Sequence, residues 1–148
     1  MKRINGRGPK DKGRGFENEI VASILAAFTQ LTANDVRARS MGDHGVDIML
    51  SEAALKIIPL AIECKRVGRI GDLNLPAALL QAQHNIVPGT APAVVYREDR
   101  HRPMAALWLE DLASVLGYPP KALPPAVVSI GWDALLKIFR GIEDIRRA

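Results

Sequence analysis

The apolar run from Ile57 to Cys64 constrains the fold of this chain more than any other segment. It is rich in β-branched side chains, which predicts a strand buried in the middle of a sheet. Side chains alternate across a strand, so Glu63 and Lys65 are expected on one face and Ile62 and Cys64 on the other. Because buried charges are costly when they are unpaired, Glu63 and Lys65 require a partner that neutralises them.

Helical and extended patterns alternate around this strand. Apolar residues spaced three and four apart from Phe16 to Leu31 predict an amphipathic helix. The run at 46–50 predicts a strand that pairs with the Ile57–Cys64 strand through a hairpin. Further elements are expected as a strand at 36–39, a glycine-bracketed loop at 40–45, a helix capped by Asn74 and reaching 87, strands at 93–96 and 104–109, a short helix at 110–116, a strand at 126–130 and a helix at 132–142. This order predicts an α/β fold in which a mixed sheet is flanked by helices.

Length and charge suggest one globular core with a basic tail. The chain has 148 residues, of which 48% are hydrophobic and 24% charged, the balance of a folded protein. Six basic residues and one acid lie within 1–14, a glycine-rich segment expected to form a flexible arm, whereas the rest of the chain carries 14 basic and 15 acidic residues. The arm fits a DNA phosphate backbone, with Lys10, Lys12 and Arg14 as candidate contacts, and equally fits a solubilising terminus. The core is expected at 15–117, with a proline-rich linker, a strand and a helix of the same domain at 118–148.

Several classes of protein do not fit the sequence. A single cysteine excludes an intramolecular disulfide and a zinc site built on cysteines. The longest apolar run is far shorter than the roughly 18 residues of a membrane helix, and residues 1–15 do not resemble a secretory leader, so we expect a cytoplasmic protein without a membrane partner. Glycine-rich nucleotide loops, serine or cysteine triads and zinc-ligand spacing of the three histidines are also missing.

Two further acids are expected near Glu63. Asp47, on the neighbouring strand, brings a second carboxylate within reach, and two carboxylates form an oxygen-ligand site for a hard cation such as Mg²⁺. Lys65 would then orient or deprotonate a water molecule, or stabilise a charged phosphate. Glu17 projects from the apolar face of the first helix, where the cost of burial favours a contact with a metal or a base over an interaction with the helix dipole. The alternative for the Glu63-Cys64-Lys65 triplet is an ordinary surface ion pair.

These segments together resemble the PD-(D/E)XK nuclease superfamily, and most closely the archaeal-type Holliday junction resolvases and their phage-encoded relatives. The resemblance extends over residues 12–109 and is carried by Lys12 to Ile20, by Arg39-Ser40 leading into Val46-Asp47-Ile48, and by Ala61-Ile62-Glu63-Cys64-Lys65. It implies a restriction-endonuclease-like fold and a homodimer that nicks opposing strands of four-way DNA junctions. It also implies acids that bind one or two Mg²⁺ ions, with Mn²⁺ as a substitute, and a lysine that assists the attacking water.

Position by position, the resemblance assigns metal-binding roles to Glu17, Asp47 and Glu63, a further ligand to the backbone carbonyl of Cys64, and the catalytic lysine to Lys65. The chain departs from the family pattern in three respects. Val46 stands in place of the motif's proline, the separation between Asp47 and Glu63 is longer than in the resolvases, and residues after 118 have no counterpart.

Supporting roles are less specific. Gln81 lies on the helix after the catalytic strand, where many of these nucleases place a glutamine near the site, and Arg39 matches a position that could contact phosphate. The alternatives are a solvated helix residue and an exposed strand arginine. We expect His44 in a surface turn, the basic cluster at 97–102 in solvent, and the apolar face of 132–142 either at a dimer interface or in the core of the monomer.

The resemblance leaves other functions open. A nuclease of the same superfamily could act on flaps, single strands or specific duplex sites. A catalytically silent accessory protein that binds DNA would keep the sheet and the basic tail without the chemistry.

Overall fold

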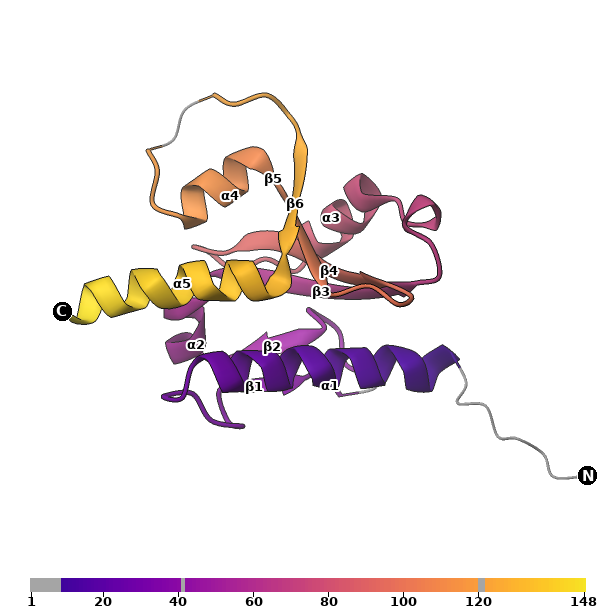
Figure 1. Ribbon diagram of the computed structural model, residues 1–148, viewed down its shortest axis with the longest axis horizontal. Coiled ribbons are helices and arrows are strands. Elements are labelled where there is room, and N and C mark those ends of the chain that lie inside the picture. The colour runs from indigo at the N-terminus through magenta and orange to yellow at the C-terminus, as the bar shows by residue number, and fades with distance from the viewer. Residues whose placement is uncertain (1–8, 41, 120–121) are drawn as a thin grey trace, which may run out of the picture.

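The computed structural model describes residues 9–40, 42–119 and 122–148, with side chains from Arg14 onward. The elements follow the order α1 (Pro9–Ala27), β1 (Val36–Ala38), β2 (Ile48–Leu50), α2 (Glu52–Ile57), β3 (Leu60–Val67), the short 3-10 helix η1 (Ile70–Asp72), α3 (Leu75–Gln83), β4 (Ala91–Glu98), β5 (Met104–Trp108), α4 (Leu109–Val115), β6 (Val127–Gly131) and α5 (Trp132–Arg147). The expected α/β class, a mixed sheet flanked by helices, is confirmed (Figure 1).

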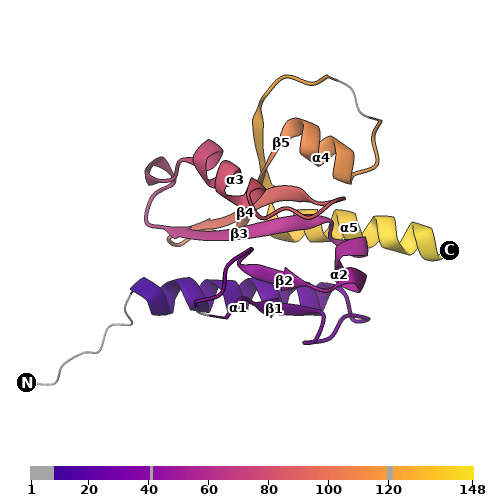
Figure 2. The same cartoon turned by 180° about the vertical axis from the view of Figure 1, so that it is seen from behind.

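The main sheet has four strands in the order β3-β4-β5-β6. β3 and β4 are parallel, with Lys65 opposite Tyr96, and the connection between them contains α3. β5 runs antiparallel to both of its neighbours, β4 and β6. β1 and β2 form a separate antiparallel pair that lies with α1 on one side of the main sheet, and α3 lies on the other (Figures 1 and 2).

The expected hairpin between 46–50 and the following strand is wrong. A helix, α2, separates the two strands, and β2 pairs with β1 instead. The local reason is that Ser51 caps this helix by accepting a hydrogen bond from the Ala54 backbone N–H at 3.1 Å, and good helix formers follow it. Pro59 disfavours a helical conformation at the residue before it, so β3 begins at Leu60.

Two apolar clusters cover the faces of the main sheet. The larger lies between the sheet, α1 and α5 and contains Phe16, Ile20, Ile24 and Phe28 of α1 with Trp132, Leu135, Leu136 and Phe139 of α5. The smaller lies under α3 and consists of Ala78, Leu79, Val94, Tyr96 and Ala106. Of the two alternatives for the apolar face of 132–142, the structure therefore shows the second, because this face completes the core of the monomer.

The helix α1 begins earlier than the sequence pattern suggests. Residues 9–14 are expected in a flexible arm but form the first turns of α1 instead. Pro9 is the first residue of this helix, a position that accommodates proline because the N–H that proline lacks has no partner within the helix. Residues 1–8 of the expected arm lie outside the described residues. Lys10 and Lys12 belong to the α1 backbone, but their side chains lie outside the described part of the structure. None of the helices in the described ranges is both long and apolar enough to span a membrane.

Candidate active site

Asp47 lies at the outer edge of β3 and is buried, with 7% of its surface exposed. Its backbone N–H donates to the Ile62 carbonyl at 3.1 Å, and its Oδ2 accepts from the Cys64 backbone N–H at 2.8 Å. Arg39 closes the base of the 40–45 loop, because its N–H donates to the Asp47 carbonyl at 2.9 Å and its Nη2 lies 3.3 Å from Oδ1. The loop between β1 and β2 thus delivers one carboxylate to the edge of the sheet.

Glu63 and Lys65 both face α3, as the alternation along the strand predicts. Glu63 is 6% exposed, and its Oε1 lies 3.6 Å from Lys65 Nζ. Gln81 of α3 joins them, because its Nε2 donates to Glu63 Oε1 at 3.1 Å and its Oε1 accepts from Lys65 Nζ at 3.2 Å. The structure therefore places Gln81 in the site as a partner of both charged residues.

Burial and the neighbouring Asp47 carboxylate make ionisation of Glu63 costly. The pKa of Glu63 rises to about 7, first because of burial and then because of the negative charge and the hydrogen-bonding contact of Asp47. Lys65 and Arg39 oppose this rise without cancelling it. The positive charges of Lys65 and Arg39 are therefore too weak to offset the burial of Glu63 and its repulsion by Asp47.

Glu17 approaches the same edge from the other side of the sheet. It lies on α1, is half-buried, and has a raised pKa, first because of burial and then because of the negative charge of Asp47. Burial also raises the pKa of the Cys64 thiol well above its usual value, with further contributions from Asp47, Glu17 and Glu63. Asp47 therefore acts electrostatically on both Glu17 and Glu63, and all three predicted acids act on Cys64 at the outer edge of β3.

The donor set fits a hard divalent cation. The Cys64 N–H points to Asp47, and since the N–H and C=O of a strand residue point to the same edge, the Cys64 carbonyl lies on that edge too. Two carboxylates and a carbonyl are ligands that Mg²⁺ accepts, and its charge would offset the repulsion that raises the pKa of Glu63. Among the described side chains, however, no three of the His, Cys, Asp and Glu type are gathered closely enough to hold an ion together. Asp47 and Glu63 form the close pair, and Glu17 stands further out.

Comparisons with models of protein families, with curated proteins and with solved structures find no match to this chain. The resemblance to PD-(D/E)XK nucleases therefore rests on the motif residues of the sequence alone.

The remaining candidates divide between the site and the surface. Arg39 contacts Asp47 and is part of the site. Arg14 is exposed, and its positive charge partly opposes the rise in the pKa of Glu17. His44 is exposed in its loop, as expected.

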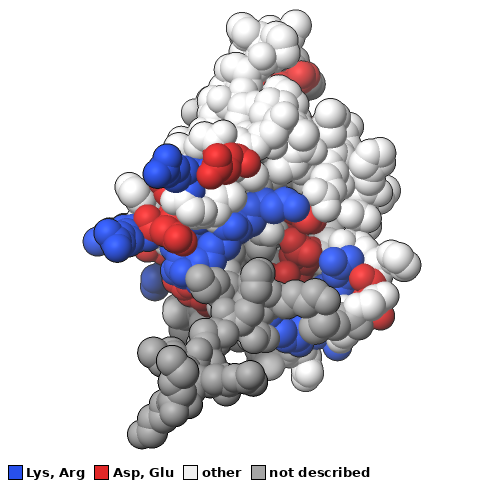
Figure 3. Space-filling model, turned by 90° about the vertical axis from the view of Figure 1, so that its right-hand side faces the viewer, with Lys and Arg blue, Asp and Glu red and all other residues white. Residues whose placement is uncertain are grey.

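On the face that Figure 3 shows, acidic and basic side chains gather in the lower and middle part of the molecule, whereas the upper part is nearly free of them.

The sequence pattern missed one contact beside the site. Arg97, at the end of β4, was expected in a solvated turn, but its Nη1 bonds both oxygens of Glu19 at 2.7 and 2.6 Å. Its guanidinium also lies 5.3 Å from the centre of the Phe16 ring. This contact fastens α1 to the sheet two residues from Glu17. The prediction failed because Arg97 and Glu19 are 78 residues apart, and only the position of Arg97 on a strand rather than in the turn could have indicated it.

Proposed function

We propose that this chain is a Mg²⁺-dependent endodeoxyribonuclease of the PD-(D/E)XK type that hydrolyses phosphodiester bonds in branched DNA, with four-way junctions as the preferred substrate. The observation that carries the proposal is the buried pair of carboxylates, Asp47 and Glu63, beside the ammonium group of Lys65. Burying this much charge in a small domain is costly and is a common signature of a functional site.

The residues have separable roles in such a reaction. Asp47, Glu63 and the Cys64 carbonyl would hold Mg²⁺, with Glu17 close enough to contribute charge or to orient a water ligand. When bound, the cation supplies Lewis acidity and lowers the pKa of a ligated water. Lys65, whose side chain is 32% exposed, is accessible to a phosphate or a water molecule.

Gln81 and Arg39 support these groups. Gln81 fixes the orientation of both Glu63 and Lys65, since it donates to one and accepts from the other. Arg39 holds the Asp47 carboxylate and, with a side chain that is 28% exposed, can also reach a DNA phosphate. The site therefore needs no group outside this chain except the cation, the water and the substrate.

The preference for branched DNA is supported by the likeness of the motifs to resolvases and by the basic residues near the start of the chain. Six of the first 14 residues are basic, which favours contact with phosphates rather than with base edges. Recognition by shape and phosphate position is what a junction-selective enzyme requires. The affinity of this protein for DNA should therefore decrease steeply as the salt concentration rises.

Cleavage of four labelled substrates tests the proposal. A four-way junction, a flap, a single strand and a linear duplex are each incubated with Mg²⁺ or with EDTA. We expect paired, symmetric nicks in the junction that require Mg²⁺. Lys65→Ala should lose about 10³-fold or more in rate, because a charged group next to the reacting phosphate is removed. Lys137→Ala, which changes an exposed lysine of α5, is the matched control and should retain activity.

Each other outcome has a defined meaning. Cleavage of flaps, single strands or duplex in preference to junctions would keep the nuclease and overturn the junction preference. Binding to DNA without Mg²⁺-dependent cleavage of any substrate would indicate an accessory protein and overturn the enzyme. Full activity of Lys65→Ala would show that the site is assigned wrongly.

A further inference from the structure

The C-terminal end of β3 and the turn between β4 and β5 carry an excess of arginine. Segments 66–69 and 97–102 together contain five arginines and two acids, whereas residues 15–148 as a whole contain 14 basic and 15 acidic residues. The Asp99 backbone N–H donates to the Val67 carbonyl at 2.9 Å, so the two segments lie against each other. We call these two segments the arginine end. It lies at the same end of the molecule as the start of α1 (Figures 1 and 2).

The two acids of the arginine end already have partners. The Glu98 carboxylate accepts a backbone hydrogen bond at 3.2 Å and lies 3.5 Å from His101 Nδ1. The Asp99 carboxylate lies 3.6 Å from Arg66 Nε. Arg97 is held by the acid of α1 described above. Among the side chains that the structure describes, three arginines of this end are exposed and have no ion pair: Arg69, Arg100 and Arg102.

Arg100 has a backbone conformation that does not suit an arginine. Its φ is 67°, and no other non-glycine residue in the described ranges has a positive φ. Glycine adopts this left-handed region without steric cost, whereas a residue with a Cβ is strained there. The turn keeps this shape because the His101 N–H donates to the Glu98 carbonyl at 3.0 Å. A strained arginine at a position that suits glycine indicates that its side chain has a function.

The arginine end adjoins the candidate active site. Lys65 lies two residues before Val67 on β3, which is about 7 Å along the strand. The phosphates of one DNA strand are spaced about 3.4 Å apart along the helix axis. When a phosphate lies at Lys65, the phosphates about two to four nucleotides away are therefore within reach of arginine side chains at this end.

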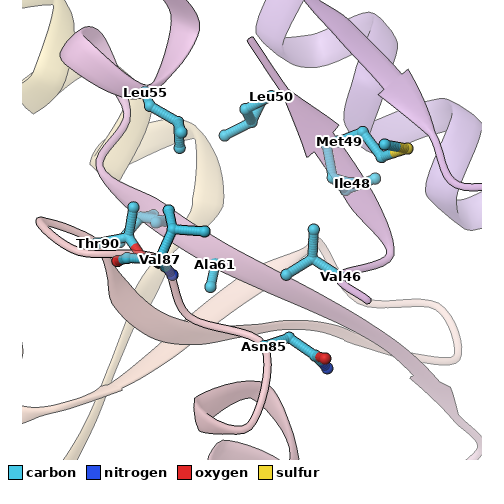
Figure 4. A pocket seen from close by; sticks show the side chains of 10 residues that line it. Val46, Ile48, Met49, Leu50, Leu55, Ala61, Asn85, Val87 and Thr90 are labelled. Carbon is cyan, nitrogen blue, oxygen red and sulfur yellow. Dashed lines mark hydrogen bonds between the residues drawn. The ribbon is translucent and has the colours of Figure 1, made fainter. Parts of the chain in front are cut away.

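The surface on the other side of Asp47 has no charge to offer. Figure 4 shows a groove beside the first half of β3, into which Val46 and Ala61 project. The residues that line it include no Asp, Glu, Lys or Arg, so it provides no counter-charge for a phosphate. Because Val46 precedes Asp47, the candidate active site lies between this groove and the arginine end. The charge along β3 therefore directs a DNA strand from the site toward the arginine end.

We propose that Arg69, Arg100 and Arg102 bind phosphates of the DNA strand about two to four nucleotides from the bond that is cut. A guanidinium group suits this role, because its planar set of donors pairs with phosphate oxygens. The inference rests on the proposed function and deepens it, because it assigns the direction in which the substrate leaves the active site. These contacts are separate from those expected of residues 10–14 on α1.

Binding of a labelled four-way junction in Ca²⁺ tests the inference without requiring cleavage. Fluorescence anisotropy measures the affinity over a range of salt concentrations. Alanine at Arg69, Arg100 and Arg102 should weaken binding by about 100-fold at about 0.1 M salt and make the slope of log K against log salt shallower by up to about 3. Alanine at three exposed bases of α2 and α5 is the matched control, because it removes the same charge away from the β4–β5 turn: Lys56, Lys137 and Arg140. The control should change both quantities much less.

Arg100→Gly separates binding from folding. Glycine relieves the left-handed backbone, so the melting temperature should equal that of the wild type or exceed it. Junction binding should nevertheless weaken by about 10-fold at about 0.1 M salt, because one phosphate contact is lost. A purely structural role for Arg100 would change the melting temperature and leave the affinity unchanged, which would overturn its assignment.

Single methylphosphonate linkages, which are uncharged, locate the contact along the strand. The wild type should lose affinity when the linkage lies about two to four nucleotides from the cut, and the triple alanine variant should not respond at these positions. A triple variant that responds there as the wild type does would overturn the inference.

Failure of the inference and failure of the proposed function give different results. A wild type that cuts junctions, together with a triple variant that binds them as tightly as the control does, would overturn only the inference. A wild type that binds DNA through the three arginines and cuts no substrate would support the phosphate contacts and overturn the nuclease. A wild type that binds no DNA would overturn both.

Discussion

The Asp47 carboxylate accepts a hydrogen bond at 2.8 Å from the backbone N–H of Cys64, which lies 17 residues further along the chain. This one contact places an acidic side chain against the edge of β3 at the point where Glu63 and Lys65 leave its face. It explains why the two carboxylates are close although one comes from the loop before β2 and the other from β3. It also makes Asp47 the residue whose substitution is most informative.

Asp47→Asn should abolish cleavage and preserve folding. The amide oxygen can still accept from Cys64, but the charge that would attract a cation is lost, so the rate should decrease by about 10³-fold or more. Binding to a four-way junction, measured by fluorescence anisotropy in Ca²⁺, should remain within a few-fold of wild type. Cleavage at the wild-type rate would remove Asp47 from the site.

The metal-free protein should lose stability as pH rises from about 4.5 to about 7, owing to Glu63. Its folded pKa, about 7, lies above its ordinary value of 4.5, so the folded state binds more protons than the unfolded state in this window. The stabilisation is present below the ordinary value and is lost as pH rises through the folded pKa. Urea denaturation in EDTA at about pH 5 and pH 8 measures the decrease. Glu63→Gln should lose less stability between these two pH values than the wild type does. An equal loss in both proteins would show that Glu63 does not cause it.

Mg²⁺ should stabilise the protein more at about pH 8 than at about pH 5. At the higher pH the Glu63 carboxylate is charged, and a ligand that binds only the folded state raises the melting temperature. The effect should be several degrees at millimolar Mg²⁺ and should disappear in Asp47→Asn and Glu63→Gln. A shift of the same size in these variants would place the binding elsewhere.

Arg97→Ala should weaken the response to Mg²⁺ as well as the fold. Arg97 holds Glu19 and Phe16 of α1, and Glu17 lies on the same part of that helix. The loss of a partly exposed ion pair, in which one guanidinium nitrogen bonds both oxygens of Glu19, and of a cation–π contact should cost about 1 kcal/mol in the free energy of unfolding. Arg147→Ala removes a comparable pair with Glu143 at the end of α5 and is the control. If both variants keep the same thermal response to Mg²⁺, Arg97 has only a structural role.

Replacing Lys10, Lys12 and Arg14 with alanine should reduce the salt dependence of DNA binding. Removal of one phosphate contact makes the slope of log K against log salt shallower by about 1, so the slope of the triple variant should be shallower by up to about 3. The mid-point of Mg²⁺ binding should change little. Substitution of Lys137 and Arg140 on α5 is the control, and an unchanged slope in the triple variant would exclude these residues as phosphate contacts.

Local signals predicted the helices better than the pairing of strands. The Asn74 cap, with Pro76 in the first turn, located the start of α3, and apolar spacing located α1 and α5. The partner of β2 could not be read in this way, because Ser51 and the residues after it form a helix that removes the hairpin. Strand pairing depends on which segments pack together, and periodicity within one segment carries no information about it.

The sequence by itself determined that Glu63 and Lys65 share a face, because alternation along a strand is a local property of the backbone. Only the tertiary structure decided that Asp47 meets Cys64, that Gln81 bridges Glu63 and Lys65, and that Arg97 holds Glu19. These pairs are separated by 16 to 78 residues. Contacts over such separations form when the packing of α1, α3 and the sheet brings them together, and that packing is a property of the whole core.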